Sequence, residues 1–131
     1  MVVDGQVYGG TAQGIGTALY EEMAFDERGQ PLGSTFSDYL LPGPTEVPSL
    51  RVLHLETPSP YSRFGQKGVG ESGAIAPPAA ITNAINDALN EFGAELLESP
   101  VTPRRILEAI DRARQAASGV RVPPAEMVSS T

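Results

Sequence analysis

The stretch from Lys67 to Gly73 is the part of the sequence best suited to chemistry, because its three glycines surround a single carboxylate, Glu71. Glycine lets the backbone adopt conformations that are closed to other residues and come close to a ligand. An acid on such a bare loop can exchange a proton with a bound substrate or cofactor. The alternative is a surface turn with a solvated acid, because loops carry function but most of their acids do not.

Two glycine-rich segments imitate nucleotide-binding fingerprints. Residues 68–73 read G-x-G-x-x-G, and residues 10–16 look like the glycine motif of short-chain dehydrogenases. A dinucleotide fingerprint needs a buried strand directly before it and an acid about 20 residues beyond it. Residues 59–67 are not a buried strand, and no Tyr is followed four residues later by Lys. Nucleotide binding is therefore a disfavoured third interpretation, which measurable NAD(P) binding would support.

The composition limits the classes of protein that fit. The chain has 131 residues, a formal net charge of −7 and no cysteine. It therefore predicts one domain, no nucleic-acid partner, no disulfide and no cysteine-ligated iron–sulfur cluster in this chain. A single histidine, His54, cannot build a metal site. Without a signal peptide or an apolar run near 18 residues, we expect a cytoplasmic protein with no membrane contact.

Three helices are predicted from periodicity and capping residues. Apolar positions favour a first helix over Gly10–Met23, in which glycine and alanine leave the first turns unusually bare. Such a start costs about 1 kcal/mol per glycine, which implies close packing against a backbone or a ligand. A second helix follows Pro77 and ends at Gly93, and a third starts with Thr102 as its N-cap.

Extended segments complete the expected fold. A turn at 26–29 would join the pieces 23–25 and 30–41 into a hairpin, and Leu50–Glu56 reads as a strand. Gly and Pro together number 26, so long loops are expected. The predicted fold class is α+β, with three helices packed on a small, mostly antiparallel sheet. We expect one domain over 1–117 and a flexible tail over 118–131.

Four segments in a fixed order resemble one enzyme family, the molybdenum hydroxylases. The family includes xanthine dehydrogenase, aldehyde oxidase and the aerobic carbon monoxide dehydrogenase. The matching residues, spread over most of 3–112, are Gly5-Gln6 with Gly9-Gly10 and Gln13-Gly14-Ile15-Gly16, then Asp38-Tyr39-Leu40-Leu41-Pro42, then Lys67-Gly68-Val69-Gly70-Glu71, and last Ser99-Pro100 with Thr102-Pro103. The chain looks like the C-terminal part of the molybdopterin-binding large subunit.

The resemblance implies roles for particular residues. The glutamate that closes the Lys-Gly-x-Gly-Glu motif is the general base of the family, which maps onto Glu71. The glutamine of the Gln-Gly-x-Gly motif hydrogen-bonds the cofactor, which maps onto Gln13; from the residues alone, Gln13 would be a helix surface residue. The cofactor would be molybdopterin, in its simple or its cytosine dinucleotide form. We also assign Gly14 and the loop residues to the cofactor site, the latter being Lys67, Gly68, Val69 and Gly70.

The implied function is oxidative hydroxylation of an aldehyde or an N-heterocycle, with water as the source of oxygen. The family's subunit is several times longer than this chain, so the chain would supply half a site and be inactive alone. Its expected partners are the remainder of the subunit and the FAD-binding and 2Fe-2S subunits or domains. The alternative is a non-catalytic structural remnant that only folds or self-associates through apolar surface left exposed.

Overall fold

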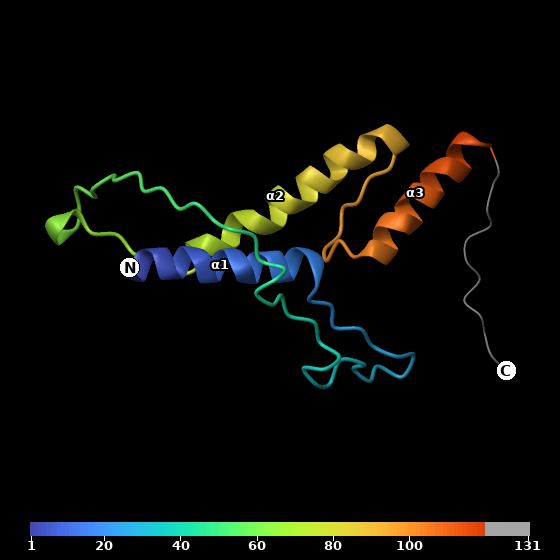
Figure 1. Ribbon diagram of the computed structural model, residues 1–131, viewed down its shortest axis with the longest axis horizontal. Helices are drawn as coiled ribbons and strands as arrows, with labels where there is room; N and C mark the ends of the chain where they lie inside the picture. Colours follow the sequence, from blue (N-terminus) through green and yellow to red (C-terminus); the bar gives the residue numbers. More distant parts are fainter. Residues whose placement is uncertain (120–131) are drawn as a thin grey trace.

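A computed structural model describes residues 1–119 as three helices joined by long irregular segments (Figure 1). The helices are α1 (Val2–Leu19), α2 (Ser72–Leu89) and α3 (Pro103–Ala117). Two single 3-10 turns, η1 (Arg63–Gly65) and η2 (Asn90–Phe92), lie in the connections. No helix within these residues is both long and apolar enough to cross a membrane. Most of the predicted tail, residues 120–131, lies outside the described residues.

Helix α1 begins about two turns earlier than the sequence predicts and ends four residues sooner, at Leu19. Its early turns pack on the start of α2, where Gly73 approaches the carbonyl oxygens of Gln6 and Val7. This packing offsets the low helix propensity of the glycines, because tertiary contacts outweigh intrinsic propensity. Beyond the helix, the N–H groups of Tyr20 and Glu21 both donate to the carbonyl of Gly16 and close its last turn.

Helix α2 begins at Ser72, one and a half turns before the predicted start at Pro77. Pro77 and Pro78 therefore lie inside the helix, although proline lacks the N–H that a helix interior normally uses. The predicted end is confirmed: η2 continues α2 to Phe92, and Gly93 follows with φ +63°. Glycine suits this left-handed position because it carries no Cβ.

The predicted α+β fold is wrong, because residues 1–119 contain no strand and no sheet. The expected hairpin is reduced to one antiparallel bridge between Phe25 and Pro31, around a turn in which Gly29 takes φ +78°. The segment 50–56 is irregular, and Leu53 and Leu55 are 76% and 91% exposed. A strand needs a partner backbone, and the prolines of the neighbouring segments supply no ladder for it.

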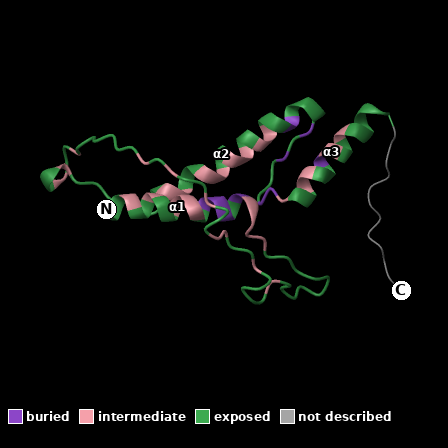
Figure 2. Cartoon of the chain, viewed as in Figure 1, coloured by how far each residue is buried: buried purple, intermediate pink, exposed green. Residues whose placement is uncertain are grey.

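The buried core is small and lies where α2, α3 and the connection between them meet the end of α1 (Figure 2). Its buried members are Leu89, Ala94, Leu96, Val101 and Ala109. Val101 donates its N–H to the carbonyl of Ala18, 2.6 Å away, and so fixes the connection to α1. Thr102 caps α3 by accepting from the N–H of Arg105, as the sequence predicts.

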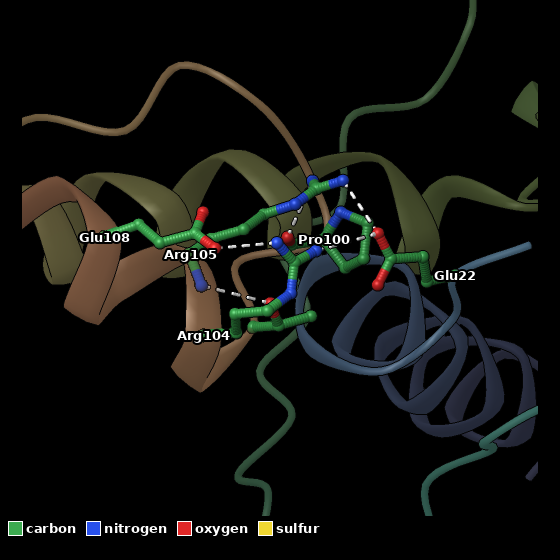
Figure 3. Close-up of polar contacts among 6 residues, drawn as sticks. Glu22, Pro100, Arg104, Arg105 and Glu108 are labelled. Atoms are coloured by element: carbon green, nitrogen blue, oxygen red, sulfur yellow. Dashed lines mark hydrogen bonds and ion pairs between the residues drawn. The ribbon is translucent and has the colours of Figure 1, made fainter. Parts of the chain in front are cut away.

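Polar side chains hold α3 against the rest of the chain (Figure 3). Arg105 donates to the carbonyl of Pro100 at 3.0 Å and to Glu22 beyond the end of α1 at 2.8 Å. Arg104 pairs with Glu108 one turn further along α3, at 2.8 Å. Both arginines lie near Glu22, but Arg105 is the less exposed of the two. Its contact with Glu22 is therefore stronger than that of Arg104.

Candidate functional site

The two glycine-rich segments singled out in the sequence pack against each other, because α1 and α2 run side by side in the same direction (Figure 1). A Cβ added to Gly10 would lie 2.8 Å from backbone atoms of Gly73 and Ala74. One turn further along α1, a Cβ on Gly14 would lie 2.8 Å from Cβ of Pro77. Gly10 and Gly14 therefore let α1 and α2 approach each other closely.

Glu71 occupies the N-cap position of α2 instead of a free loop. Its side chain is exposed and makes no capping hydrogen bond. Gly70 before it takes φ +48°, a left-handed conformation that glycine adopts without strain. The carboxylate is thus presented by a tight turn at a helix N-terminus, where the helix dipole favours a negative charge.

Gln6 of α1 also belongs to the candidate site, although it was not assigned there from the sequence. Its side-chain Nε2 donates to the carbonyl oxygen of Gly70 at 2.9 Å, 64 residues away in the chain. The available signal was its spacing from Gln13, because residues seven apart lie on the same face of a helix. Gln6 and Gln13 are both exposed, and the same face of α1 therefore carries a second glutamine roughly 10 Å further along the helix.

A cavity of about 680 Å³ lies beside the glycine loop. It brings Lys67, Gly68 and Val69 together with the first turn of α1 and with the segment 53–58. Two side-chain contacts hold its walls: Nε2 of His54 lies 2.7 Å from Oδ1 of Asp4, and Lys67 donates to the hydroxyl of Thr57 at 2.5 Å. A Cβ added to Gly68 would meet no atom of residues 1–119 within 4 Å apart from its chain neighbours, so a ligand can approach this backbone.

Asp4 is one of the charged residues that line this cavity. Hydrogen bonds from the amino group of Met1 and from His54 hold the pKa of Asp4 below its ordinary value of 3.8. The carboxylate is therefore ionised at neutral pH. The Asp4–His54 contact joins α1 to a segment that has no regular structure of its own.

The structure brings some of the predicted site residues together and separates others. Lys67, Gly68 and Val69 share the cavity, whereas Gln13 and Glu71 are not among its lining residues. Gly14 is buried against Pro77, which explains a small residue there by helix packing. Their roles toward a cofactor stay predictions.

Comparison with known proteins identifies the family. The molybdopterin cofactor-binding domain family matches residues 1–48, which comprise α1 and the segment that follows it. The nicotine 6-hydroxylase large subunit of Paenarthrobacter nicotinovorans is 45% identical over 82% of this chain and 13% of its own. The carbon monoxide dehydrogenase large chain of Hydrogenophaga pseudoflava is 36% identical over 84% of this chain and 14% of its own. The chain belongs to the molybdenum hydroxylase family.

A solved structure shares the arrangement of the helices and loops. The quinoline 2-oxidoreductase from Pseudomonas putida 86 is 47% identical and superposes with a TM-score of 0.81. The match covers 85% of this chain and 14% of that chain. The molybdenum hydroxylase relatives are therefore about seven times longer than the region that they share with this chain.

Proposed function

We propose that this chain supplies the catalytic glutamate and part of the molybdopterin site of a molybdenum hydroxylase. Its single strongest support is the position of Glu71 at the N-terminus of α2, where the carboxylate is exposed and makes no hydrogen bond to a partner within residues 1–119. The glycines on either side leave the carboxylate open to a flat substrate. Glu71 would act as the general base, holding and releasing the proton at its carboxylate.

The residues present fit one side of a pterin-type cofactor. The loop 67–70 offers unobstructed backbone at Gly68 beside a roomy cavity, and Gln13 offers an exposed amide with both donor and acceptor atoms. These two elements would hold the cofactor, in its simple or its cytosine dinucleotide form, together with segments outside this chain. The bound cofactor would supply the redox chemistry, and the chain its orientation and the base.

An N-heterocycle is the substrate class that the relatives favour. Two of them are named for nicotine and quinoline, which are both nitrogen heterocycles. The proposed reaction is hydroxylation of such a ring, or of an aldehyde, with water as the source of oxygen. A flat substrate agrees with the bare surroundings of Glu71, since no large side chain adjoins it between Gly68 and Gly73 except Val69.

The proposed partners follow from the share of the relatives that this chain covers. The remainder of a molybdopterin-binding subunit would complete the site. FAD-binding and 2Fe-2S subunits or domains would carry the electrons away. The nicotine 6-hydroxylase relative is named as a large subunit, and 6-hydroxypseudooxynicotine dehydrogenase, a second relative, is named as a subunit of a complex. Both names support assembly with other chains.

The second candidate function is a non-catalytic structural remnant of such a subunit. It is favoured by the exposure of large apolar side chains, among them Phe36 at 85% and Leu55 at 91%. Such surface promotes association whether or not a cofactor is present. The two functions differ in whether Glu71 matters.

Co-expression with the remainder of a molybdopterin-binding subunit tests the proposal. We expect the complex to retain molybdenum and to oxidise members of a panel of N-heterocycles and aldehydes with a dye as electron acceptor. Glu71→Gln should lower kcat by at least about 100-fold, since it removes the base without changing shape. Glu91→Gln, an exposed acid in η2, serves as the matched control and should leave kcat unchanged. A folded complex without molybdenum would favour the structural remnant.

A further inference from the structure

Gln6 makes a contact that neither the helix packing nor the proposed cofactor site explains. Its Nε2 donates to the carbonyl of Gly70, the residue that precedes Glu71. Within residues 1–119, Gln6 is the one side chain from outside residues 67–73 that hydrogen-bonds the backbone of this segment; the hydroxyl of Ser72, within it, donates to the carbonyl of Val69. The carbonyl of Gly70 and the N–H of Glu71 belong to one peptide plane, so this bond fixes how Glu71 leaves the loop.

The loop needs such an anchor because its own bonds are few. Ser72 donates its N–H to the carbonyl of Val69 at 3.0 Å, which closes one turn. Gly70 has no side chain and takes φ +48°, a region in which glycine has wide freedom. A peptide plane between two flexible residues can rotate unless one of its polar atoms is held.

We propose that Gln6 is a positioning residue for Glu71, acting through the Gly70–Glu71 peptide. Only the catalytic consequence of this inference rests on the proposed function. Gln6 acts through the carbonyl of Gly70, and its amide sets the direction from which the carboxylate of Glu71 reaches the reacting atoms. Small displacements of a catalytic group lower kcat strongly, while substrate affinity depends on other contacts.

Two substitutions isolate the donated hydrogen bond. Gln6→Glu keeps the shape but offers only acceptor atoms at neutral pH, and Gln6→Met keeps the length without any donor. Gln, Glu and Met have similar helix propensities, so α1 itself should be unaffected. Gly5→Ala is the matched control on the neighbouring residue, because nothing lies within 4 Å of an added Cβ.

Hydrogen exchange of the Ser72 amide in the chain alone is the first measurement. Loss of one neutral hydrogen bond should speed exchange about five-fold in both Gln6 variants, and Gly5→Ala should not. Unchanged exchange at Ser72 in both Gln6 variants would overturn the inference. This readout requires no cofactor, so it stands even if the proposed function fails.

Kinetics of the co-expressed complex are the second measurement. Both Gln6 variants should lower kcat about tenfold or more while KM stays within about twofold, a split that simple loss of folded protein would not produce. Faster exchange with an unchanged kcat would overturn the positioning role. An inactive wild-type complex would instead overturn the proposed function, and the exchange comparison would still decide whether Gln6 holds the loop.

Discussion

The phenol of Tyr39 is held by the carboxylate of Glu21. The hydroxyl of Tyr39 donates to Oε2 of Glu21 at 2.7 Å, just beyond the end of α1. That hydrogen bond, assisted by burial and by the negative charge of Glu21, raises the pKa of Tyr39 above its ordinary value of 10.0. The contact anchors the irregular segment 23–41 to the first helix.

The pH dependence of this pair follows from the sign of the shift. A raised pKa in the folded state means that the neutral phenol stabilises the fold below pH 10.0, and that this contribution is lost as pH rises through the folded pKa. In an ultraviolet titration of the phenolate, Glu21→Gln should bring the Tyr39 transition back toward 10.0. Tyr39→Phe identifies the transition, and superposable curves for the wild type and Glu21→Gln would contradict the assignment.

The contact between α1 and the start of α2, next to Glu71, can be tested by substituting two glycines of α1. In Gly10→Ala, the new Cβ would lie 2.8 Å from the backbone of Gly73 and Ala74, which cannot move aside cheaply. Overpacking of this kind costs about 1–3 kcal/mol and exceeds the roughly 1 kcal/mol that alanine gains in helix propensity. Gly5→Ala meets nothing within 4 Å and should stabilise the chain.

Urea unfolding followed by circular dichroism measures both changes. The midpoint should fall for Gly10→Ala and rise for Gly5→Ala. If both substitutions raise the midpoint, the close approach of α1 and α2 at Gly10 is absent. If both lower it, the loss at Gly10 does not arise from the contact with α2.

A second packing test concerns the connection between α2 and α3. The amide of Asn86 clamps the backbone of Leu96, donating to its carbonyl at 2.8 Å and accepting from its N–H at 2.9 Å. Asn86→Ala should cost about 1–3 kcal/mol of unfolding free energy, because it strands two partly buried backbone groups. Asn83→Ala, an exposed position on the same helix, should cost less than about 0.5 kcal/mol. Equal losses in the two variants would contradict the clamp.

At the scale of helices and strands, the sequence predicts that a helix exists better than it predicts where the helix ends, and it predicts strands poorly. Periodicity and capping indicated three helices, and Thr102 and Gly93 marked two boundaries correctly. The early starts of α1 and α2 depend on a backbone contact between distant glycines, which no local pattern reveals. The alternating residues of 50–56 predicted a strand, but a strand also depends on a partner that a local pattern does not specify.

The candidate site, like the fold, could be predicted from the sequence only in part. Glycine density marked the Glu71 loop from the sequence, and resemblance to a family suggested the role that we propose for its acid. Gln6 holds the loop, and Asp4 and His54 hold the cavity beside it; both contacts join residues that are 50 or more apart in the chain. Their partners become visible only when the chain is folded, because local spacing carries no information on such contacts.

The molecule as a whole has too little core for its size. The chain exposes 10443 Å², whereas a compact monomer of 13.8 kDa exposes roughly 6,600 Å². Large apolar side chains account for part of this excess, notably Phe36, Leu53, Leu55, Tyr61 and Phe64, each more than 75% exposed. The same open arrangement recurs within the much longer chain of quinoline 2-oxidoreductase. This surface is therefore of the kind that another part of a molybdenum hydroxylase subunit would cover.

Apolar surface on this scale predicts that the chain alone will self-associate. In size-exclusion chromatography with light scattering, its apparent mass should rise with concentration, and it should bind a hydrophobic dye. Replacing Phe36 and Leu55 by serine should weaken both signals with little effect on helix content, because neither side chain is buried in this chain. Co-expression with the remainder of a molybdopterin-binding subunit should abolish dye binding, since the same side chains would then be covered. A strictly monomeric chain that binds no dye would show that the exposed residues are covered by the chain itself, and would contradict the open arrangement from which the need for a partner is inferred.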